Sequence, residues 1–273
     1  MKTRGERWRR VILKGLVLVF FSWAGGAYAS GAELTRVRVL SYNIHHGEGG
    51  DGRLDLERIA ALIVEAQVDV VALQEVDQAT TRTGGVDQAS ELGRLTGMRV
   101  FYGKAMDYQG GAYGQALLSR WPLEETQVHR LSNPSAREPR IAVSALVRPP
   151  QGRAFRFVGT HLDAGREDRD RWEQAGDLHQ RFVDDPHPVI LVGDFNARPD
   201  SRVMERLLAF WNDASAARPD FTVPAKNPTA RIDYILLSPV PAWRVLSTQV
   251  LPEPVASDHR PVRADLELPE SAD

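Results

Sequence analysis

The stretch that decides the fold is "VILVGDFN", residues 189–196. Its first four residues are aliphatic, which is typical of a strand buried within a sheet. The run then ends in Asp194 and Asn196, polar side chains that need a partner at the end of a buried strand. Because both alternate with Phe195, we expect them on the same side of the strand, while Gly193 allows a close approach of the backbone.

Similar apolar runs recur along the chain and predict more strands than helices. Strands are expected within residues 35–47, 68–77, 114–120, 141–147, 155–162, 189–196, 231–237 and 258–268. Apolar spacing predicts helices after a cap at Asp55, over residues 168–182 and over residues 201–211. A doubly wound parallel sheet needs a helix between most strand pairs, so mixed sheets with hairpins fit better.

The first 29 residues have the pattern of a secretory signal. Basic side chains at positions 2, 4, 7, 9 and 10 precede the short apolar run of residues 15–24 and the small-x-small motif Ala27-Tyr28-Ala29. That run is shorter than the roughly 20 apolar residues needed to span a bilayer. We therefore expect cleavage after Ala29, a periplasmic or secreted protein, and one α/β domain over residues 30–273.

The composition is that of a large globular domain. The chain has 273 residues, no cysteine and 42% hydrophobic residues, which excludes a disordered chain and a disulfide scaffold. Residues 1–29 carry six of the 34 basic and one of the 36 acidic residues, so 28 basic and 35 acidic residues remain, a net charge of −7. Binding of nucleic acid through a broadly basic surface is not favoured, although a local basic patch stays open.

Polar side chains recur at the ends of the predicted strands. Asn43 ends the first strand and Glu75 follows the apolar run "VVAL" with one residue between them. Each such residue has an ordinary structural explanation, such as a turn, a surface ion pair or a satisfied histidine. The set as a whole favours a functional site, and it comprises Asn43, Glu75, His161, Asp194, Asn196, Asp233, Asp258 and His259.

In order, the motifs resemble those of the endonuclease/exonuclease/phosphatase superfamily, which includes DNase I-like nucleases, inositol polyphosphate 5-phosphatases and neutral sphingomyelinases. They run from about residue 36 to residue 268 and are "SYNI", "LQE", "GQALLSR", "THL", "GDFNARPDS", "RIDYIL" and "SDHRPV". The resemblance implies an α/β (α+β) fold, a four-layer sandwich of two mixed β-sheets flanked by helices. It places the active site where the strand ends converge.

The resemblance also implies a metal-dependent cleavage of phosphate esters. A hard cation with oxygen ligands suits the negative charge of a phosphoryl group. Glu75 is the strongest candidate metal ligand, with Asn43 and Asp258 beside it. Because the chain has no cysteine and no clear histidine triad, we expect Mg²⁺ or Mn²⁺ rather than Zn²⁺.

The remaining members of the set have catalytic roles by resemblance. Asp194 would accept a proton from the attacking water, and Asn196 would hold the nucleophile or the phosphate. His259 would contact the phosphate and be oriented by Asp233. His161 would be a second imidazole facing the phosphate, with Glu138 as a candidate partner.

Two positions depart from the pattern of the superfamily. AP endonucleases carry an acid two residues after the first-strand Asn, where this chain has His45, followed by His46. Whether either histidine is a metal ligand or a polar loop residue stays open. Tyr113 is a candidate for the tyrosine that such nucleases place before the "GQALLSR" strand.

The motifs predict the type of reaction better than the substrate. We expect an exported, monomeric phosphodiesterase or phosphatase acting on a small or lipid-derived ester, with membrane lipid a candidate substrate. The first alternative is an exported nuclease that uses the same residues. A non-catalytic binding protein with this fold is the second alternative, although such a protein would not need all of these polar side chains.

Overall fold

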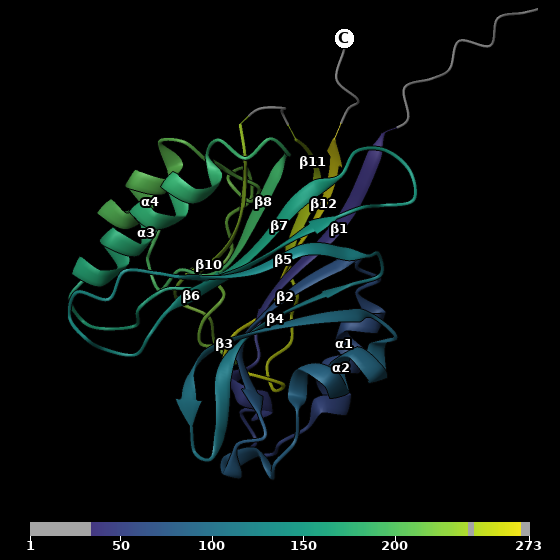
Figure 1. Ribbon diagram of the computed structural model, residues 1–273, viewed down its shortest axis with the longest axis vertical. Coiled ribbons are helices and arrows are strands. Elements are labelled where there is room, and N and C mark those ends of the chain that lie inside the picture. Colours follow the sequence, from purple (N-terminus) through teal and green to yellow (C-terminus); the bar gives the residue numbers. More distant parts are fainter. Residues whose placement is uncertain (1–33, 240–242, 269–273) are drawn as a thin grey trace, which may run out of the picture. The chain divides into compact units, whose positions relative to one another are not determined.

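Two six-stranded mixed sheets lie at the centre of the domain (Figure 1). The computed structural model describes residues 34–239 and 243–268. The predicted signal peptide, residues 1–29, lies outside the described residues. No helix in the described part of the chain is long and apolar enough to cross a membrane.

The first sheet has the strand order β11-β12-β1-β2-β4-β3. The β1 and β2 strands are parallel and the other neighbours are antiparallel. The strands are β1 (Thr35–Asn43), β2 (Val70–Gln78), β3 (Arg99–Tyr108), β4 (Gly111–Ser119), β11 (Arg244–Val250) and β12 (Val262–Leu268).

The second sheet has the order β5-β6-β7-β8-β10-β9, and only its central pair, β7 and β8, is parallel. Its strands are β5 (Leu123–Arg130), β6 (Ile141–Val147), β7 (Phe155–His161), β8 (Val189–Asp194), β9 (Asn212–Asp213) and β10 (Asp233–Leu237). Each sheet thus combines one parallel pair with hairpin-like neighbours, as the sequence predicts.

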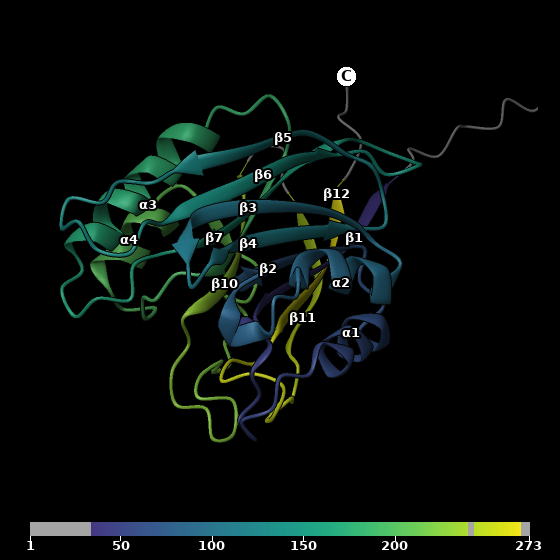
Figure 2. The same ribbon diagram turned by 60° about the horizontal axis from the view of Figure 1, so that its bottom comes forward.

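Helices cover the outer face of each sheet (Figures 1 and 2). They are α1 (Leu56–Glu65), α2 (Gln88–Thr96), α3 (Arg169–Phe182) and α4 (Arg202–Leu208), with short 3-10 turns η1 (His45–Gly47) and η2 (Thr81–Thr83). One apolar cluster lies between the sheets, a second under α1 and α2, and a third under α3 and α4. Three cores between four layers confirm the predicted sandwich.

The ends of some helices and strands agree with the sequence prediction, and the ends of others do not. The Asp55 side chain caps α1 by accepting from Arg58 N at 2.9 Å. The last strand begins at Val262 rather than at residue 258, because Pro261 has no N–H to donate to a ladder. The elements α2, β3, β5 and β11 were not expected from the sequence. The strand β5 is an edge strand with mostly exposed side chains, so its pattern lacks a clear apolar face.

Candidate active site

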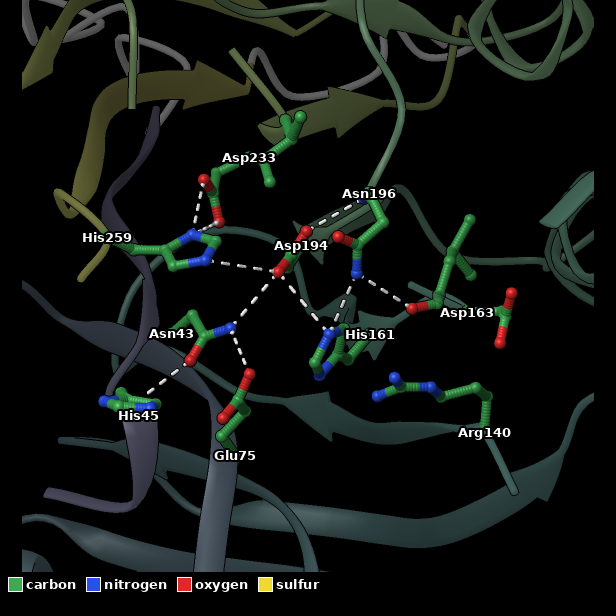
Figure 3. A network of polar contacts seen from close by, with 12 residues as sticks. Asn43, His45, Glu75, Arg140, His161, Asp163, Asp194, Asn196, Asp233 and His259 are labelled. Atoms are coloured by element: carbon green, nitrogen blue, oxygen red, sulfur yellow. Dashed lines mark hydrogen bonds and ion pairs between the residues drawn. The ribbon is translucent and has the colours of Figure 1, made fainter. Parts of the chain in front are cut away.

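Asp194 lies at the end of β8 between the ends of two neighbouring strands (Figure 3). In the ladder it stands opposite His161 at the end of β7 and opposite Asp233 at the start of β10. Its Oδ2 lies 3.4 Å from His161 Nε2 and 3.6 Å from His259 Nε2. The structure thus brings two imidazoles to one carboxylate oxygen that is almost completely buried.

Gly193 makes this convergence possible by letting β8 approach β7. Its φ is 153°, and a Cβ atom at this position would lie 2.0 Å from the carbonyl oxygen of Thr160. No side chain fits at that distance, so the residue must be glycine for the strands to pair as they do. The close approach expected from the sequence is present.

Asn196 reaches the cleft through a left-handed turn and not through strand alternation. The strand ends at Asp194, and Asn196 has a φ of 47°. Its backbone N donates to Asp194 Oδ1 at 2.8 Å, and its Nδ2 lies 3.1 Å from both His161 Nε2 and the Leu162 carbonyl oxygen. An amide nitrogen only donates, so His161 Nε2 accepts this bond. In this structure the amide, which we expect to hold the nucleophile or the phosphate, orients His161.

Glu75 is aimed into the site by a β-bulge. The register of β2 against β4 shifts between Leu73 and Val76, so that one extra residue is accommodated in β2. Glu75 itself has a φ of 57°, in the left-handed region that a non-glycine residue adopts only at some cost. Bulges of this kind redirect a side chain next to a functional site.

Asn43 joins the Glu75 and Asp194 carboxylates (Figure 3). Its Nδ2 donates to Glu75 Oε1 at 2.9 Å and to Asp194 Oδ2 at 3.1 Å. Its Oδ1, the atom expected to bind a metal, accepts from the backbone N of His45 at 3.0 Å. In this arrangement Asn43 holds the two acids in place and also fixes the start of η1.

His259 forms the predicted pair with Asp233. Its Nδ1 lies 2.9 Å and 3.1 Å from the two Asp233 oxygens. Burial disfavours the charged imidazole, but Asp233, with smaller contributions from Asp194 and Asp258, raises the pKa of His259 to about 10. His259 is therefore a buried cation at neutral pH, oriented toward Asp194.

The other two titratable groups are shifted by burial. Burial and the negative charge of Asp233 raise the pKa of Asp194 to about 7. Burial, with the positive charges of Arg140 and His259, lowers the pKa of His161 well below its usual value. A neutral imidazole, an imidazolium and a carboxylate that ionises near neutral pH therefore lie side by side, which is typical of acid–base catalysis.

These groups open onto a cleft of about 300 Å³. It is lined by Glu75, Arg82, Met106, Tyr108, Tyr113, Glu138, Arg140, His161, Ala164, Asp194, Asn196 and His259. The candidate tyrosine Tyr113 is thus a wall residue, and burial raises its pKa well above the usual value. A wider hollow of about 760 Å³ beside Arg218 and Arg260 contains none of the predicted site residues.

Glu138 does not pair with His161 as we had expected. Its Oε1 lies 3.0 Å from Arg140 Nη1, whereas His161 contacts Asn196 and Asp194. Glu138 and Arg140 are two residues apart on the same connection, so this arginine is the nearer partner of the Glu138 carboxylate. The Arg140 guanidinium extends toward His161 (Figure 3), and none of the residues that the structure describes forms a hydrogen bond with its buried Nε.

Asp258 also differs from expectation. Its side chain is exposed, and its carboxylate accepts from Ser257 Oγ at 3.3 Å. Within residues 34–239 and 243–268, it belongs to neither group of side chains whose ligand atoms lie close enough to share a metal. Asp258 contributes to the negative charge near His259.

Sequence reasoning missed the cationic wall of the cleft. Arg82 forms two hydrogen bonds of 2.6 and 2.8 Å with Asp77, a fully buried carboxylate, and its guanidinium lies 4.6 Å from the centre of the Tyr108 ring. The one available signal was Asp77 itself, a second acid at the end of the buried strand β2. A buried acid requires a partner, but the sequence does not indicate which arginine supplies it.

Two groups of side chains have the composition of a metal site. Ligand atoms lie within 4.8 Å of one another in the set His45, His46 and Glu75, and in the set Asp194, Asp233 and His259. The second set is already paired internally. In the first, the buried Nδ1 of His46 has no hydrogen-bond partner among the described residues, an arrangement that costs about 1–3 kcal/mol unless a ligand satisfies it. The donor set around Glu75 therefore fits a divalent ion.

Comparison with known proteins agrees with this geometry. A sequence profile of the Endonuclease/Exonuclease/phosphatase family matches residues 40–259, which include Glu75, Asp194 and His259. The chain belongs to this family. It is also 27% identical to the protein YbhP of Escherichia coli over 256 residues, which cover 85% of this chain and 96% of that protein.

Solved structures of family members share the fold. An endonuclease/exonuclease/phosphatase family protein from Bacteroides thetaiotaomicron has a TM-score of 0.73 and 21% identity, covering 86% of this chain and 98% of its own. The mannosyl-6-phosphatase Bt3783 of the same organism has a TM-score of 0.70 and 21% identity, covering 84% and 99%. At these identities the likeness establishes the fold alone. Family membership supports a hydrolase of phosphate esters, either a phosphoesterase or a nuclease.

Proposed function

We propose that the protein is an exported, divalent-metal-dependent hydrolase of small or lipid-derived phosphate esters. The observation that carries the proposal is the placement of Asp194, a buried carboxylate with a pKa of about 7, between a neutral and a charged imidazole beside Glu75. A purely structural carboxylate gains nothing from that arrangement, because ionisation of a buried acid with a raised pKa is unfavourable. A proton acceptor for an attacking water needs it.

The protonation state of each residue determines its proposed role in the reaction. Above pH 7, Asp194 is ionised and accepts a proton from water, while Asn43 and the backbone N of Asn196 hold its oxygens. His259, kept charged by Asp233, donates a charged hydrogen bond that stabilises negative charge on the phosphoryl group.

Glu75 would hold the divalent ion. When bound, that ion neutralises charge on the phosphoryl group and on the leaving oxygen. The role of the protein side chains is to fix Glu75 in place, which the β2 bulge and Asn43 achieve.

The cleft favours a compact anionic substrate. A volume of about 300 Å³ lies at the lower end of the range for small-molecule sites. Arg82, which is paired with Asp77, and Arg140, which is paired with Glu138, line the cleft, and Tyr108 and Tyr113 provide aromatic surface. Together they suit one phosphoryl group attached to a small or flat organic group.

A substrate panel tests the proposal. The mature protein is given p-nitrophenyl phosphate, bis-p-nitrophenyl phosphate, sphingomyelin and plasmid DNA with Mg²⁺ or Mn²⁺, and Asp194→Asn serves as the inactive control. We expect turnover of the small esters or the lipid to exceed nicking of DNA. Rapid nicking with little turnover of the other substrates would identify a nuclease instead. No turnover of any of them would support a binding protein.

Export is tested separately by fusing residues 1–35 to a reporter that is active only outside the cytoplasm. We expect reporter activity and cleavage after Ala29. A fusion that remains inside the cell would contradict export without affecting the proposed chemistry.

A further inference from the structure

The segment that follows β1 places two consecutive histidines beside Glu75. His45 and His46 form η1 together with Gly47, and all three have φ values in the left-handed region, at 45°, 43° and 80°. In an extended strand, neighbouring side chains point to opposite faces. Here the two imidazole rings converge, with centroids 4.5 Å apart.

Hydrogen bonds hold this unusual backbone in place. The Asn43 side chain accepts from the His45 backbone N, and Gln88 Nε2 donates to the His46 carbonyl oxygen at 2.7 Å. Left-handed residues other than glycine persist only where surrounding contacts determine them, and they cluster at ligand sites. The convergence is therefore a built feature of the loop.

Each histidine has a nitrogen that is suited to a metal. His45 Nδ1 lies 3.2 Å from the carbonyl oxygen of Glu48, which can only accept, so Nδ1 carries the proton and Nε2 keeps its lone pair. His46 Nδ1 is buried and has no hydrogen-bond partner within residues 34–239 and 243–268. Ligand atoms of both histidines and of Glu75 lie within 4.8 Å of one another.

We propose that His45 and His46 complete a metal site with Glu75, and that this site prefers first-row transition ions to Mg²⁺. The inference rests on the proposed function only in taking Glu75 as a metal ligand. Two imidazoles and one glutamate form a donor set that catalytic zinc sites use, with a remaining position for substrate. Mg²⁺ favours all-oxygen surroundings, whereas imidazole favours ions later in the row, in the order Mn²⁺, Co²⁺, Zn²⁺.

Direct contact with substrate explains the two histidines less well. Neither is among the residues that line the cleft, while Glu75 is. Only 9% of the surface of His46 is exposed. The pair therefore approaches Glu75 from outside the substrate cleft, as ligands of an ion would.

The test measures metal binding in the full chain without reference to turnover. Co²⁺ binding is followed by its visible spectrum, and Mn²⁺ binding by electron paramagnetic resonance with Mg²⁺ as competitor. We expect His45→Ala and His46→Ala each to weaken Mn²⁺ binding by at least about 10-fold and to change the Co²⁺ spectrum. His187→Ala, at a histidine far along the chain, is the matched control and should leave both signals unchanged.

A variant with a changed metal preference distinguishes the loss of a metal ligand from a loss of folding. His45→Asp restores the acid that AP endonucleases carry at this position, and Asp tolerates a left-handed backbone. We expect this variant to bind Mg²⁺ more tightly and Mn²⁺ less tightly than the parent. Unchanged Mn²⁺ and Co²⁺ binding in all three variants, with loss only in Glu75→Gln, would overturn the proposal. Histidine-dependent binding without turnover of any ester would instead contradict the proposed function alone.

Discussion

The two side-chain groups of the site differ in how completely their polar atoms are paired. In the group Asp194, Asp233 and His259, each side chain contacts another member, and Asn43 and Asn196 donate to the two Asp194 oxygens. The group His45, His46 and Glu75 lies on left-handed backbone and contains a buried nitrogen that has no partner in the described part of the chain.

The difference indicates which group binds a ligand and which one handles protons. A completely paired network keeps its geometry without a ligand and sets pKa values through fixed neighbours. An incompletely paired group on a strained backbone gains free energy when an ion satisfies it. Both groups contact Asn43, which therefore couples the metal site to the proton acceptor.

The largest expected effect comes from Asp194→Asn in the paired group. Losing the proton acceptor should lower kcat by about 10²- to 10⁴-fold, the usual range for a general base. Steady-state kinetics with bis-p-nitrophenyl phosphate measures this loss of kcat. The midpoint temperature of thermal unfolding should change by only about 5 °C, because an amide replaces a carboxylate of the same shape. Substantial activity in a folded variant would exclude Asp194 as the base.

Asp233→Asn should have the next largest effect. Without the Asp233 charge and hydrogen bond, burial opposes only the smaller contributions of Asp194 and Asp258, so the pKa of His259 should fall from about 10. More of His259 would then be neutral at pH 8, and kcat should fall by up to about 10²-fold. Titration of the His259 ring by nuclear magnetic resonance checks the shift. A His259 that stays charged through pH 9 would show that Asp233 is not the cause.

The same pair predicts how stability depends on pH. Because the pKa of His259 is higher in the folded protein than in the unfolded chain, its stabilisation is complete below about pH 6.5 and is lost as pH rises toward about 10. Urea unfolding at several pH values should show this loss in the parent and a smaller one in Asp233→Asn. If the free energy of unfolding decreased equally with pH in both proteins, the assigned pairing of His259 with Asp233 would be contradicted.

Gly193→Ala tests the scaffold under the paired group and should have a smaller effect. The new Cβ would lie 2.0 Å from the Thr160 carbonyl oxygen, so β7 and β8 must separate, at a cost of about 1–3 kcal/mol. Gly52→Ala is the matched control, since Gly52 also has a positive φ of 71° but no atom of the described residues lies within 4 Å of the added Cβ. Equal destabilisation of both variants, measured by urea unfolding, would show that backbone strain alone matters.

Much of the fold could be predicted from the sequence because the central strands are buried on both faces. Strand β8 consists of apolar residues up to Gly193, and such runs are easily recognised. Strands β5 and β11 were missed because they lie at sheet edges with mostly exposed side chains. Helix α2 was missed because its sequence, "QASELGRLT", is largely polar.

The sequence predicted that most of these polar side chains lie together, and it did not predict their geometry. Strand ends identified Asp194 and His161, since a polar group after an apolar run requires a partner. The bulge at Glu75 and the left-handed turn at Asn196 depend on pairing between distant strands, which the sequence does not state. For the same reason the partner of Glu138 was wrong, and Arg82 was not anticipated.

The pH dependence of kcat/KM for a small phosphate ester, measured with saturating metal, tests the account most directly. Because Asp194 must be ionised and His259 must be charged, activity should rise as pH passes about 7 and fall as pH approaches about 10. The rising limb should disappear from the residual activity of Asp194→Asn. A parent profile that is flat between pH 6 and 8, or a rising limb that persists in Asp194→Asn, would contradict the assignment of Asp194 as the proton acceptor.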